Sequence, residues 1–369
     1  MSAEPASLDS PGLLLDAMAD PHTLRGLPLS QWEALLACAR RNAVLAFLAE
    51  RASSAGILDE IPERPRLAMQ SAQMAAARLA QLARWELDRV CRVLMPAGVP
   101  IIALKGLAYI LRGLPHATTR LLSDIDILVP ADRIGDAERA LLAAGWRGTK
   151  LDPYDQEYYR RWSHEIPPLQ FPGRVLGVDV HHTICPPASR LRPDPQRFWT
   201  ASEATEIRGV GLLCPADSVL HAAVHLFFDS DFDSRFRELI DLHVLTTTFG
   251  GKDPHFWTAL VDRAREQGLG RPLYYAIRTL RAVLETPIPE STLAEIETFA
   301  PHGPVKVWMI RTLRTVLRPT DPAPWPPKHR FALWLLYVRS HWLRMPPGPL
   351  LAHLTRKAIR RPDEGAMGA

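Results

Sequence analysis

Cysteine is scarce in this chain, and long apolar runs are missing. Its 369 residues include only four cysteines, which stand far apart and form no pair with the spacing of a metal site. Isolated cysteines of this kind are typical of reduced residues in a cytosolic protein. The longest late apolar run, from Phe331 to Val338, is far shorter than the roughly 20 residues that span a bilayer.

The sequence also shows no basic, apolar start and no strong charge of one sign. Residues 1–20 contain acids and no basic start, so we expect no signal peptide. The formal net charge is only +4, and most of the excess lies between Arg339 and Arg361. This distribution gives no firm sign of a nucleic-acid footprint over the whole surface. We therefore predict a cytoplasmic protein without a transmembrane segment.

Proline, by contrast, is abundant: the chain holds 34, near twice the usual share of about 5%. Prolines and glycines bound two sets of helical patterns. The first set lies at 31–53, with Ser30 as the N-cap, and at 67–95. The second set lies at 217–228, 235–248, 254–267, 270–285, 290–300 and 303–317. Residues 319–327 hold five prolines and predict an extended connector before a final pair of helices at 329–344 and 349–361.

Strand patterns occupy the region between these two sets. Short apolar strands are predicted at 99–104 and 122–129, and each is followed by a helix, at 107–112 and 132–144. Two further segments, 162–171 and 174–182, alternate like antiparallel strands joined at Pro172-Gly173. We therefore predict an α+β protein with a small β-sheet core between helical segments. The expected division is 1–95 helical, 96–213 core, 214–318 helical and 319–369 connector with basic helices.

The stretch Leu121–Val129 carries the clearest chemistry. Successive side chains of a strand point to opposite faces, so Asp124 and Asp126 point the same way while Ile125 points the other way. Two carboxylates about 7 Å apart on an apolar strand are costly unless something positive binds them. Mg²⁺ or Mn²⁺ is the expected ion, because it takes carboxylate oxygens and leaves positions open for substrate phosphates.

A third carboxylate is available on a later predicted strand, where Asp179 lies between the apolar Val178 and Val180. Three carboxylates on adjacent strands can hold two metal ions, which clamp the attacking and leaving oxygens of phosphoryl-type transfer. Other acids compete with Asp179 for the third position: Asp155, Glu157 and Glu165.

Three residues near the first two strands are candidates for contact with an anionic substrate. Gly106 ends the first strand, where the absence of a side chain would let the backbone approach phosphates. Lys105 and Arg120 are candidates for neutralising charge on the transferring group.

Two motifs stand out, Leu104-Lys-Gly106 and Ser123-Asp-Ile-Asp126, together with the later strand aspartate, which is followed by His. They resemble the nucleotidyltransferase superfamily of the polymerase β type. The resemblance is greatest to its bacterial branch of nucleotidyltransferase family proteins. The resemblance extends from roughly Trp32 to Leu245. It implies a nucleotidyltransferase core whose mixed sheet carries the acids, and transfer of a nucleoside monophosphate from an NTP to an acceptor.

The same resemblance implies roles for individual residues. Asp124, Asp126 and Asp179 would be the catalytic and metal-binding groups. The residues that would bind the NTP are Lys105, Gly106, Arg120 and Ser123. Leu107 stands where the superfamily usually has a serine that contacts phosphate.

Two other functions are weighed against nucleotidyl transfer. An Asp-x-Asp motif also binds a metal and a nucleotide sugar in glycosyltransferases, but a parallel sheet usually precedes it there and helices precede it here. A degenerate nucleotide-binding or scaffold protein would keep the fold without turnover, and Leu107 is its main support. The acceptor has no readable signature: a small molecule, a peptide, a protein and RNA are all open.

Several histidines and charged groups remain without a firm role. His221 and His225 are one helical turn apart, a spacing that suits zinc, but no third ligand is evident and a packed helix face is favoured. His181 is either a support for Asp179 or structural. Asp241 is a candidate to face the site from the helical half. The basic stretch 339–361 is read as a packed helix with a solvated face, with a nucleic-acid backbone or an anionic membrane as alternatives.

Overall fold

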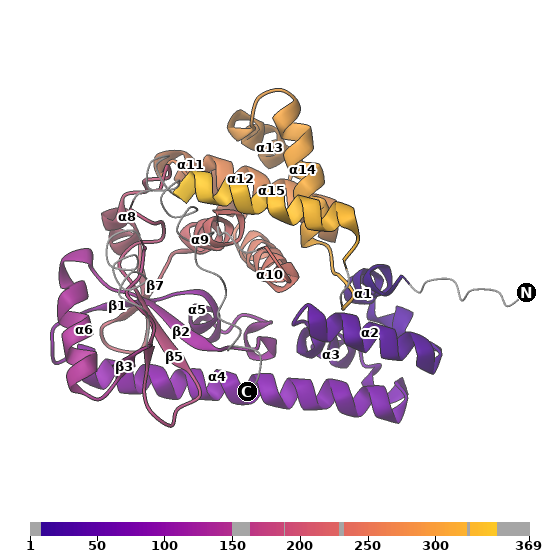
Figure 1. Ribbon diagram of the computed structural model, residues 1–369, viewed down its shortest axis with the longest axis horizontal. Helices are drawn as coiled ribbons and strands as arrows, with labels where there is room; N and C mark the ends of the chain where they lie inside the picture. Colours follow the sequence, from indigo (N-terminus) through magenta and orange to yellow (C-terminus); the bar gives the residue numbers. More distant parts are fainter. Residues whose placement is uncertain (1–8, 150–162, 188, 229–231, 323–324, 345–369) are drawn as a thin grey trace, which may run out of the picture.

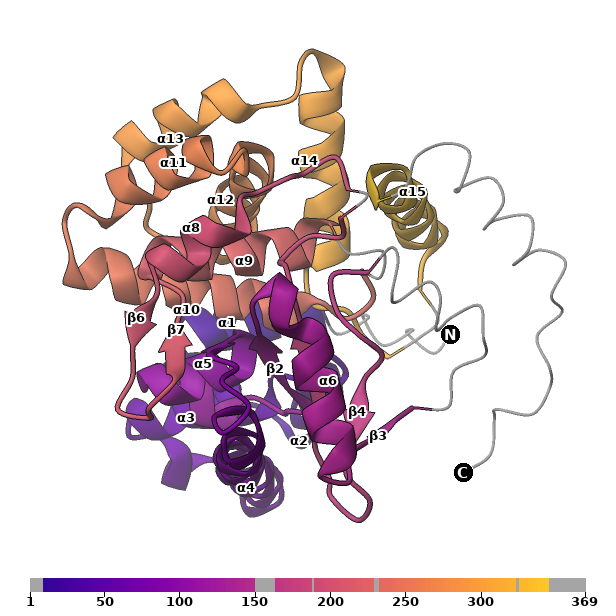
Figure 2. The same ribbon diagram turned by 90° about the vertical axis from the view of Figure 1, so that its left-hand side faces the viewer.

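The computed structural model describes residues 9–149, 163–187, 189–228, 232–322 and 325–344. Helices α1 (Ser10–Ala19), α2 (Leu29–Arg41) and α3 (Leu45–Ser54) form a cluster that packs on the long helix α4 (Glu63–Leu94). The 32 residues of α4 extend over about 48 Å at a rise of about 1.5 Å per residue. Figures 1 and 2 show that α4 passes beneath both this cluster and the sheet.

The single helix predicted over 31–53 is wrong, because the chain breaks between α2 and α3. Ala43 has a φ of 54°, in the left-handed region that a helix does not contain. The side-chain amide of Asn42 donates to the carbonyl oxygens of Cys38 at 2.7 Å and of Thr320 at 2.9 Å. Such a bond competes with continuation of the helix. Ser30 lies inside α2, whose N-cap residue is Pro28.

Within the described residues, seven strands form one mixed sheet in the order β3-β4-β5-β2-β1-β7-β6. Their bounds are β1 Ile101–Ala103, β2 Asp124–Leu128, β3 Arg147–Gly148, β4 Leu169–Gln170, β5 Gly177–His181, β6 Glu203–Ala204 and β7 Val210–Leu212. Strand β2 is antiparallel to β1 and parallel to β5. The predicted α+β class with a mixed sheet is therefore confirmed. Strands β4 and β5 are antiparallel, as the pattern around 172–173 predicted, and residue 162 lies outside the described part.

The two faces of the sheet differ in character. Ile125 and Ile127 of β2 and Val178 and Val180 of β5 are fully buried. Helices α4 and α5 (Lys105–Arg112) contact β2, and α6 (Ile134–Ala143), which follows β2 in sequence, also packs on α4. The alternate residues of β2 and β5 are the acids, and they face a cavity. One face of the sheet thus belongs to the core and the other is available for chemistry.

The remaining helices form the second half of the molecule (Figure 1). Their bounds are α8 Pro195–Thr200, α9 Pro215–Phe228, α10 Phe236–Lys252, α11 Phe256–Glu266, α12 Gly270–Leu284, α13 Glu290–Glu295, α14 Pro304–Leu317 and α15 Pro327–Arg344. Helix α12 contacts α9, α10, α11 and α14, and it buries Leu273, Tyr274 and Ile277 completely. The helix predicted at 349–361 lies outside the described residues.

The sequence predicts neither a membrane span nor a disulfide. Over the ranges that the structure describes, no helix combines the length and the apolar character that crossing a membrane requires. All four cysteines are free thiols, three of them buried.

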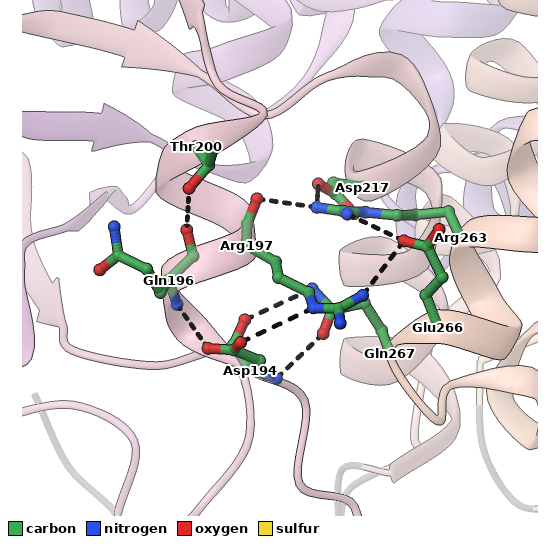
Figure 3. Close-up of polar contacts among 8 residues, drawn as sticks. All are labelled: Asp194, Gln196, Arg197, Thr200, Asp217, Arg263, Glu266 and Gln267. Atoms are coloured by element: carbon green, nitrogen blue, oxygen red, sulfur yellow. Dashed lines mark hydrogen bonds and ion pairs between the residues drawn. The ribbon is translucent and has the colours of Figure 1, made fainter.

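A buried ion pair connects α8 with α9 and α11 (Figure 3). The Arg263 guanidinium donates through Nε and Nη2 to both oxygens of Asp217, each at 2.8 Å, and Asp217 is completely buried. Nη2 also donates to the carbonyl oxygen of Arg197 at 2.8 Å. Helix α9 contributes to the cavity wall, so this pair fixes the wall against the segment that follows β5.

We predict that Arg263→Lys lowers the free energy of unfolding by about 3 kcal/mol, because lysine cannot make the planar two-point contact and leaves Asp217 poorly compensated. Denaturant unfolding followed by circular dichroism measures the change. The matched control is Arg265→Lys on the same helix, whose partner Asp262 is exposed, and we expect a change below about 0.5 kcal/mol. Equal losses in the two variants would contradict the assignment.

Candidate active site

Three of the predicted aspartates lie on one face of two neighbouring strands. In the parallel pairing of β2 with β5, Asp126 stands opposite Asp179, and Asp124 stands opposite Gly177. Because alternate residues of a strand share a face, all three carboxylates point to the same side. Asp126 is buried, and Asp124 and Asp179 are half-buried. The sheet thus brings together acids that are more than 50 positions apart in the sequence.

Lys105 and His181 hold the carboxylate of Asp126. Lys105 Nζ donates to Asp126 Oδ1 at 2.6 Å, and His181 Nε2 lies 3.0 Å from the same oxygen. Burial alone would raise the pKa of Asp126, but Lys105 and His181 outweigh it and hold that pKa well below its usual range. In return, burial would lower the pKa of Lys105 and of His181, but Asp126 and then Glu165 outweigh it and both pKa values are raised.

Asp179 has the opposite environment. Burial first, and then the charges of Asp126, Glu165 and Asp124, raise the pKa of Asp179 to about 7. Four carboxylates therefore share one region, and a cation is the group that relieves their mutual repulsion. Ser123 Oγ donates to Asp124 Oδ2 at 2.9 Å and orients that carboxylate. This donor set of oxygens beside an open cavity fits Mg²⁺ or Mn²⁺.

Of the acids that competed for the third position, Glu165 lies beside this group and joins it. It forms an antiparallel bridge with His181, the residue two places after Asp179. Asp155 and Glu157 lie outside the described residues. The structure therefore brings Glu165 into the site together with Asp179.

The turn after β1 sets the positions of Lys105 and Arg120. Lys105 has a φ of 46°, a left-handed conformation that is costly for a residue with a Cβ atom. A Cβ atom added at Gly106 would lie 2.4 Å from Leu122 Cδ2 and 2.7 Å from Arg120 Nη1. Gly106 thus lies beneath Arg120 and Leu122, away from the cavity wall, and Leu107 is buried. Glycine is needed here for close packing of Arg120.

A cavity of about 430 Å³ separates the acidic face from α9 and α10. The strand side contributes the carboxylates with Lys105 and Arg120. The opposite side is formed by the segment after β5, by α9 and by the start of α10, with Ile184, Pro186, His221, Val224, His225, Phe228, Arg235, Arg237 and Glu238. The cavity therefore has acids on its floor and arginines on its opposite wall.

Arg120, on the strand side of the cavity, is held by a buried ion pair with α10. Its Nε lies 3.2 Å from Asp241 Oδ2, and His116 Nε2 lies 3.2 Å from Asp241 Oδ1. All three side chains are buried. Burial alone would raise the pKa of Asp241, but Arg120 and His116 outweigh it and lower that pKa. Asp241 thus stands behind Arg120 and does not line the cavity.

His221 and His225 project into the cavity from α9. His225 Nδ1 lies 3.3 Å from Glu238 Oε2, and burial is the main cause that lowers the pKa of both histidines. Within the described residues, the His/Cys/Asp/Glu group close enough to share a metal ion consists of His164, Glu165 and His181. His221 and His225 are not members of that group, and they form part of the cavity wall.

Sequence reasoning missed the arginines of α10. Arg237 Nη1 donates to the carbonyl oxygen of Leu121 at 2.9 Å, just before the Asp-x-Asp strand. Burial, and then the neighbouring Arg120, lower the pKa of Arg237. In the sequence, these arginines stand with an acid at the start of an amphipathic helix. This pattern does not indicate which distant strand they face.

Comparison with known proteins now bears on this arrangement. Residues 28–285 match a protein family described as an uncharacterised nucleotidyltransferase, and they include both strands of acids and both helices of the opposite wall. The chain belongs to this family. No curated protein and no solved structure matches it. The protein is therefore a nucleotidyltransferase enzyme with an NTP as its implied substrate, and the match favours this activity over glycosyl transfer.

We predict that the nucleotidyltransferase loses stability in acid partly through Asp241. Its folded pKa is depressed, so its stabilising contribution is complete above the ordinary value of about 3.9 and is lost as the pH falls through the lower folded value. Asp241→Asn should cost about 3 kcal/mol at pH 7, because Arg120 stays buried without its counter-charge.

Chemical denaturation at pH 7 and at pH 3 measures both effects. The cost of Asp241→Asn should shrink at pH 3, which lies below the ordinary pKa of about 3.9, because Asp241 then binds a proton in the unfolded state and the stabilisation by its charge begins to be lost. The control is Asp262→Asn, an exposed acid on α11. A cost that stays constant with pH would show that the charge of Asp241 does not contribute.

Proposed function

We propose that this enzyme moves a nucleoside monophosphate from an NTP to a hydroxyl acceptor by a two-metal carboxylate mechanism, in the cavity between the acidic face of β2 and β5 and helices α9 and α10. The observation that carries the proposal is the register that sets Asp126 opposite Asp179, with Asp124 two residues earlier. An arginine-bearing wall across the cavity supports it.

Asp124, Asp126 and Asp179 are the proposed ligands of Mg²⁺ or Mn²⁺. When bound there, such ions supply charge neutralisation on the phosphates and a lowered pKa for the acceptor hydroxyl. Ser123 orients Asp124 through its 2.9 Å hydrogen bond. Lys105 and His181 both contact Asp126 Oδ1. These two contacts fix the orientation of the carboxylate and therefore the direction of its second oxygen. Asp179, whose pKa is raised to about 7 by burial and by the neighbouring carboxylates, is the group proposed to face the acceptor.

The triphosphate is proposed to lie against the arginines. Arg237 lines the cavity and makes one hydrogen bond within the described residues, to the Leu121 carbonyl. A guanidinium has five N–H donors, so four others can meet phosphate oxygens. Arg120 lines the strand side of the cavity and is fixed from behind by Asp241. This placement gives the phosphates donors from both sides of the cavity without the serine that Leu107 replaces.

The size of the cavity is consistent with a small-molecule substrate. Its volume of about 430 Å³ lies in the range of roughly 300–1,000 Å³ that is typical of ligand pockets. The acceptor is proposed to enter beside Asp179. We retain the cytoplasmic location and the division at 95/96, 213/214 and 318/319 as part of this proposal.

We predict that Asp124→Asn and Asp126→Asn each lower the transfer rate by roughly 100-fold or more, the scale on which loss of one electrostatic group at a transition state acts. The purified enzyme is incubated with Mg²⁺, a cell extract and ATP, CTP, GTP or UTP labelled at the α-phosphate, and the labelled product is quantified.

The control for this experiment is Asp132→Asn, an exposed acid just after β2 and outside the cavity, which should keep full activity. Unchanged labelling by Asp124→Asn would refute the assigned site. If the wild-type protein binds labelled NTP in the presence of Mg²⁺ but labels nothing with any of the four nucleotides, the degenerate nucleotide-binding alternative is favoured.

We predict that Arg237→Gln raises the KM for the NTP roughly 10-fold with a smaller effect on kcat, because a charge-assisted hydrogen bond to phosphate is lost from the bound substrate. Initial rates at several NTP concentrations separate the two constants. Lys252→Gln, at the exposed end of the same helix, is the control and should change neither. If kcat falls while KM stays constant, Arg237 does not contribute to binding of the NTP in the ground state.

A further inference from the structure

Glu165, the fourth carboxylate of the acidic face, lies beside two histidines, His164 and His181. None of the three has a role in the transfer described above, apart from the support that His181 gives Asp126. Glu165 and His181 are paired across an antiparallel bridge. Two backbone hydrogen bonds flank this pair, Ile166 N to Val180 O at 3.1 Å and His182 N to His164 O at 3.0 Å. Such a pair has its side chains on one face and at close range.

The ligand atoms of these three residues converge. Glu165 Oε2 lies 3.4 Å from His181 Nε2 and 3.8 Å from His164 Nε2. All three atoms lie within 4.8 Å of one another. A tetrahedral ion at about 2.1 Å from each ligand requires spacings of about 3.4 Å, so small side-chain rotations suffice. His164 and Glu165 also line the cavity, which gives an ion a path of entry.

The donor set differs from that of the aspartates. Two imidazole nitrogens and one carboxylate oxygen suit Zn²⁺ and similar transition-metal ions, whereas a set of oxygens alone suits Mg²⁺. An ion bound by His181 Nε2 would replace its hydrogen bond to Asp126 Oδ1, 3.0 Å away, and that oxygen then offers a fourth ligand. The two kinds of donor therefore meet at Asp126.

We infer that His164, Glu165 and His181 form a second metal site, which binds a transition-metal ion of the Zn²⁺ type beside the carboxylate site. The inference rests on the proposed function and deepens it, because it adds a nitrogen-bearing metal position to the same cavity. An ion held there brings positive charge next to Asp126 and Asp179, where the carboxylates are most crowded.

Titration of the metal-free, full-length protein with Co²⁺ tests the site, because Co²⁺ bound by imidazole in a four-coordinate site absorbs visible light. We expect one equivalent of Co²⁺ to give this absorption, Zn²⁺ to remove it, and excess Mg²⁺ to leave it unchanged. His164→Gln should weaken Co²⁺ binding roughly 10-fold or more, since one of three ligands is lost.

Two further variants serve as controls in the same titration. His182→Gln changes the histidine directly after His181. His182 is outside the cluster, so this variant should bind Co²⁺ as the wild type does. Asp124→Asn impairs the carboxylate site and should keep the Co²⁺ absorption. Circular dichroism of each variant shows that it is folded before it is titrated.

The inference is overturned if the wild type gives no Co²⁺ absorption, or if His164→Gln and His182→Gln bind Co²⁺ equally well; His164, Glu165 and His181 would then form only an ion-pair network. These outcomes are independent of the transfer assay. A Co²⁺ site that depends on His164 stands even if no nucleotide is transferred. If Asp124→Asn loses transfer and the protein has no Co²⁺ site, the second metal site is refuted and the proposed function stands.

Discussion

Repulsion among four carboxylates on one face of the sheet is the constraint around which this protein is arranged. The parallel register of β2 and β5 places Asp126 opposite Asp179, and the bridge to His181 adds Glu165. Lys105 and His181 compensate Asp126 directly, whereas Asp179 retains a raised pKa. The protein thus tolerates a locally unfavourable group of charges, which is the pattern expected where a cationic cofactor is to be bound.

Arginines on both sides of the cavity supply the opposite charge at fixed positions. Arg120 is buried against Asp241, and Arg237 is anchored on the Leu121 carbonyl, so both guanidinium groups are positioned from behind. The Asp217–Arg263 pair holds α9 against the segment that follows β5. Preorganised charges of both signs across a cavity of limited size suit an anionic substrate that carries metal ions.

Much of the strand-borne site could be predicted from the sequence, because the two-residue period of a strand fixes the face of Asp124, Asp126 and Asp179. The α+β class followed from the order of the patterns. The break at Asn42 could not be predicted, since it depends on a bond to Thr320, 278 positions away. The contribution of Arg237 and the packing role of Gly106 likewise depend on neighbours that only the folded chain brings close.

Helix α4 has a consequence for how such a protein can change over evolution. It packs against the N-terminal helices, and the same unbroken helix also contacts β2, α5 and α6. Exchange of residues 1–95 for those of a relative would therefore replace one side of the sheet's core together with α1–α3. The N-terminal helices are not a module that can be gained or lost independently, and their substitutions should be correlated with those of the strands that carry the acids.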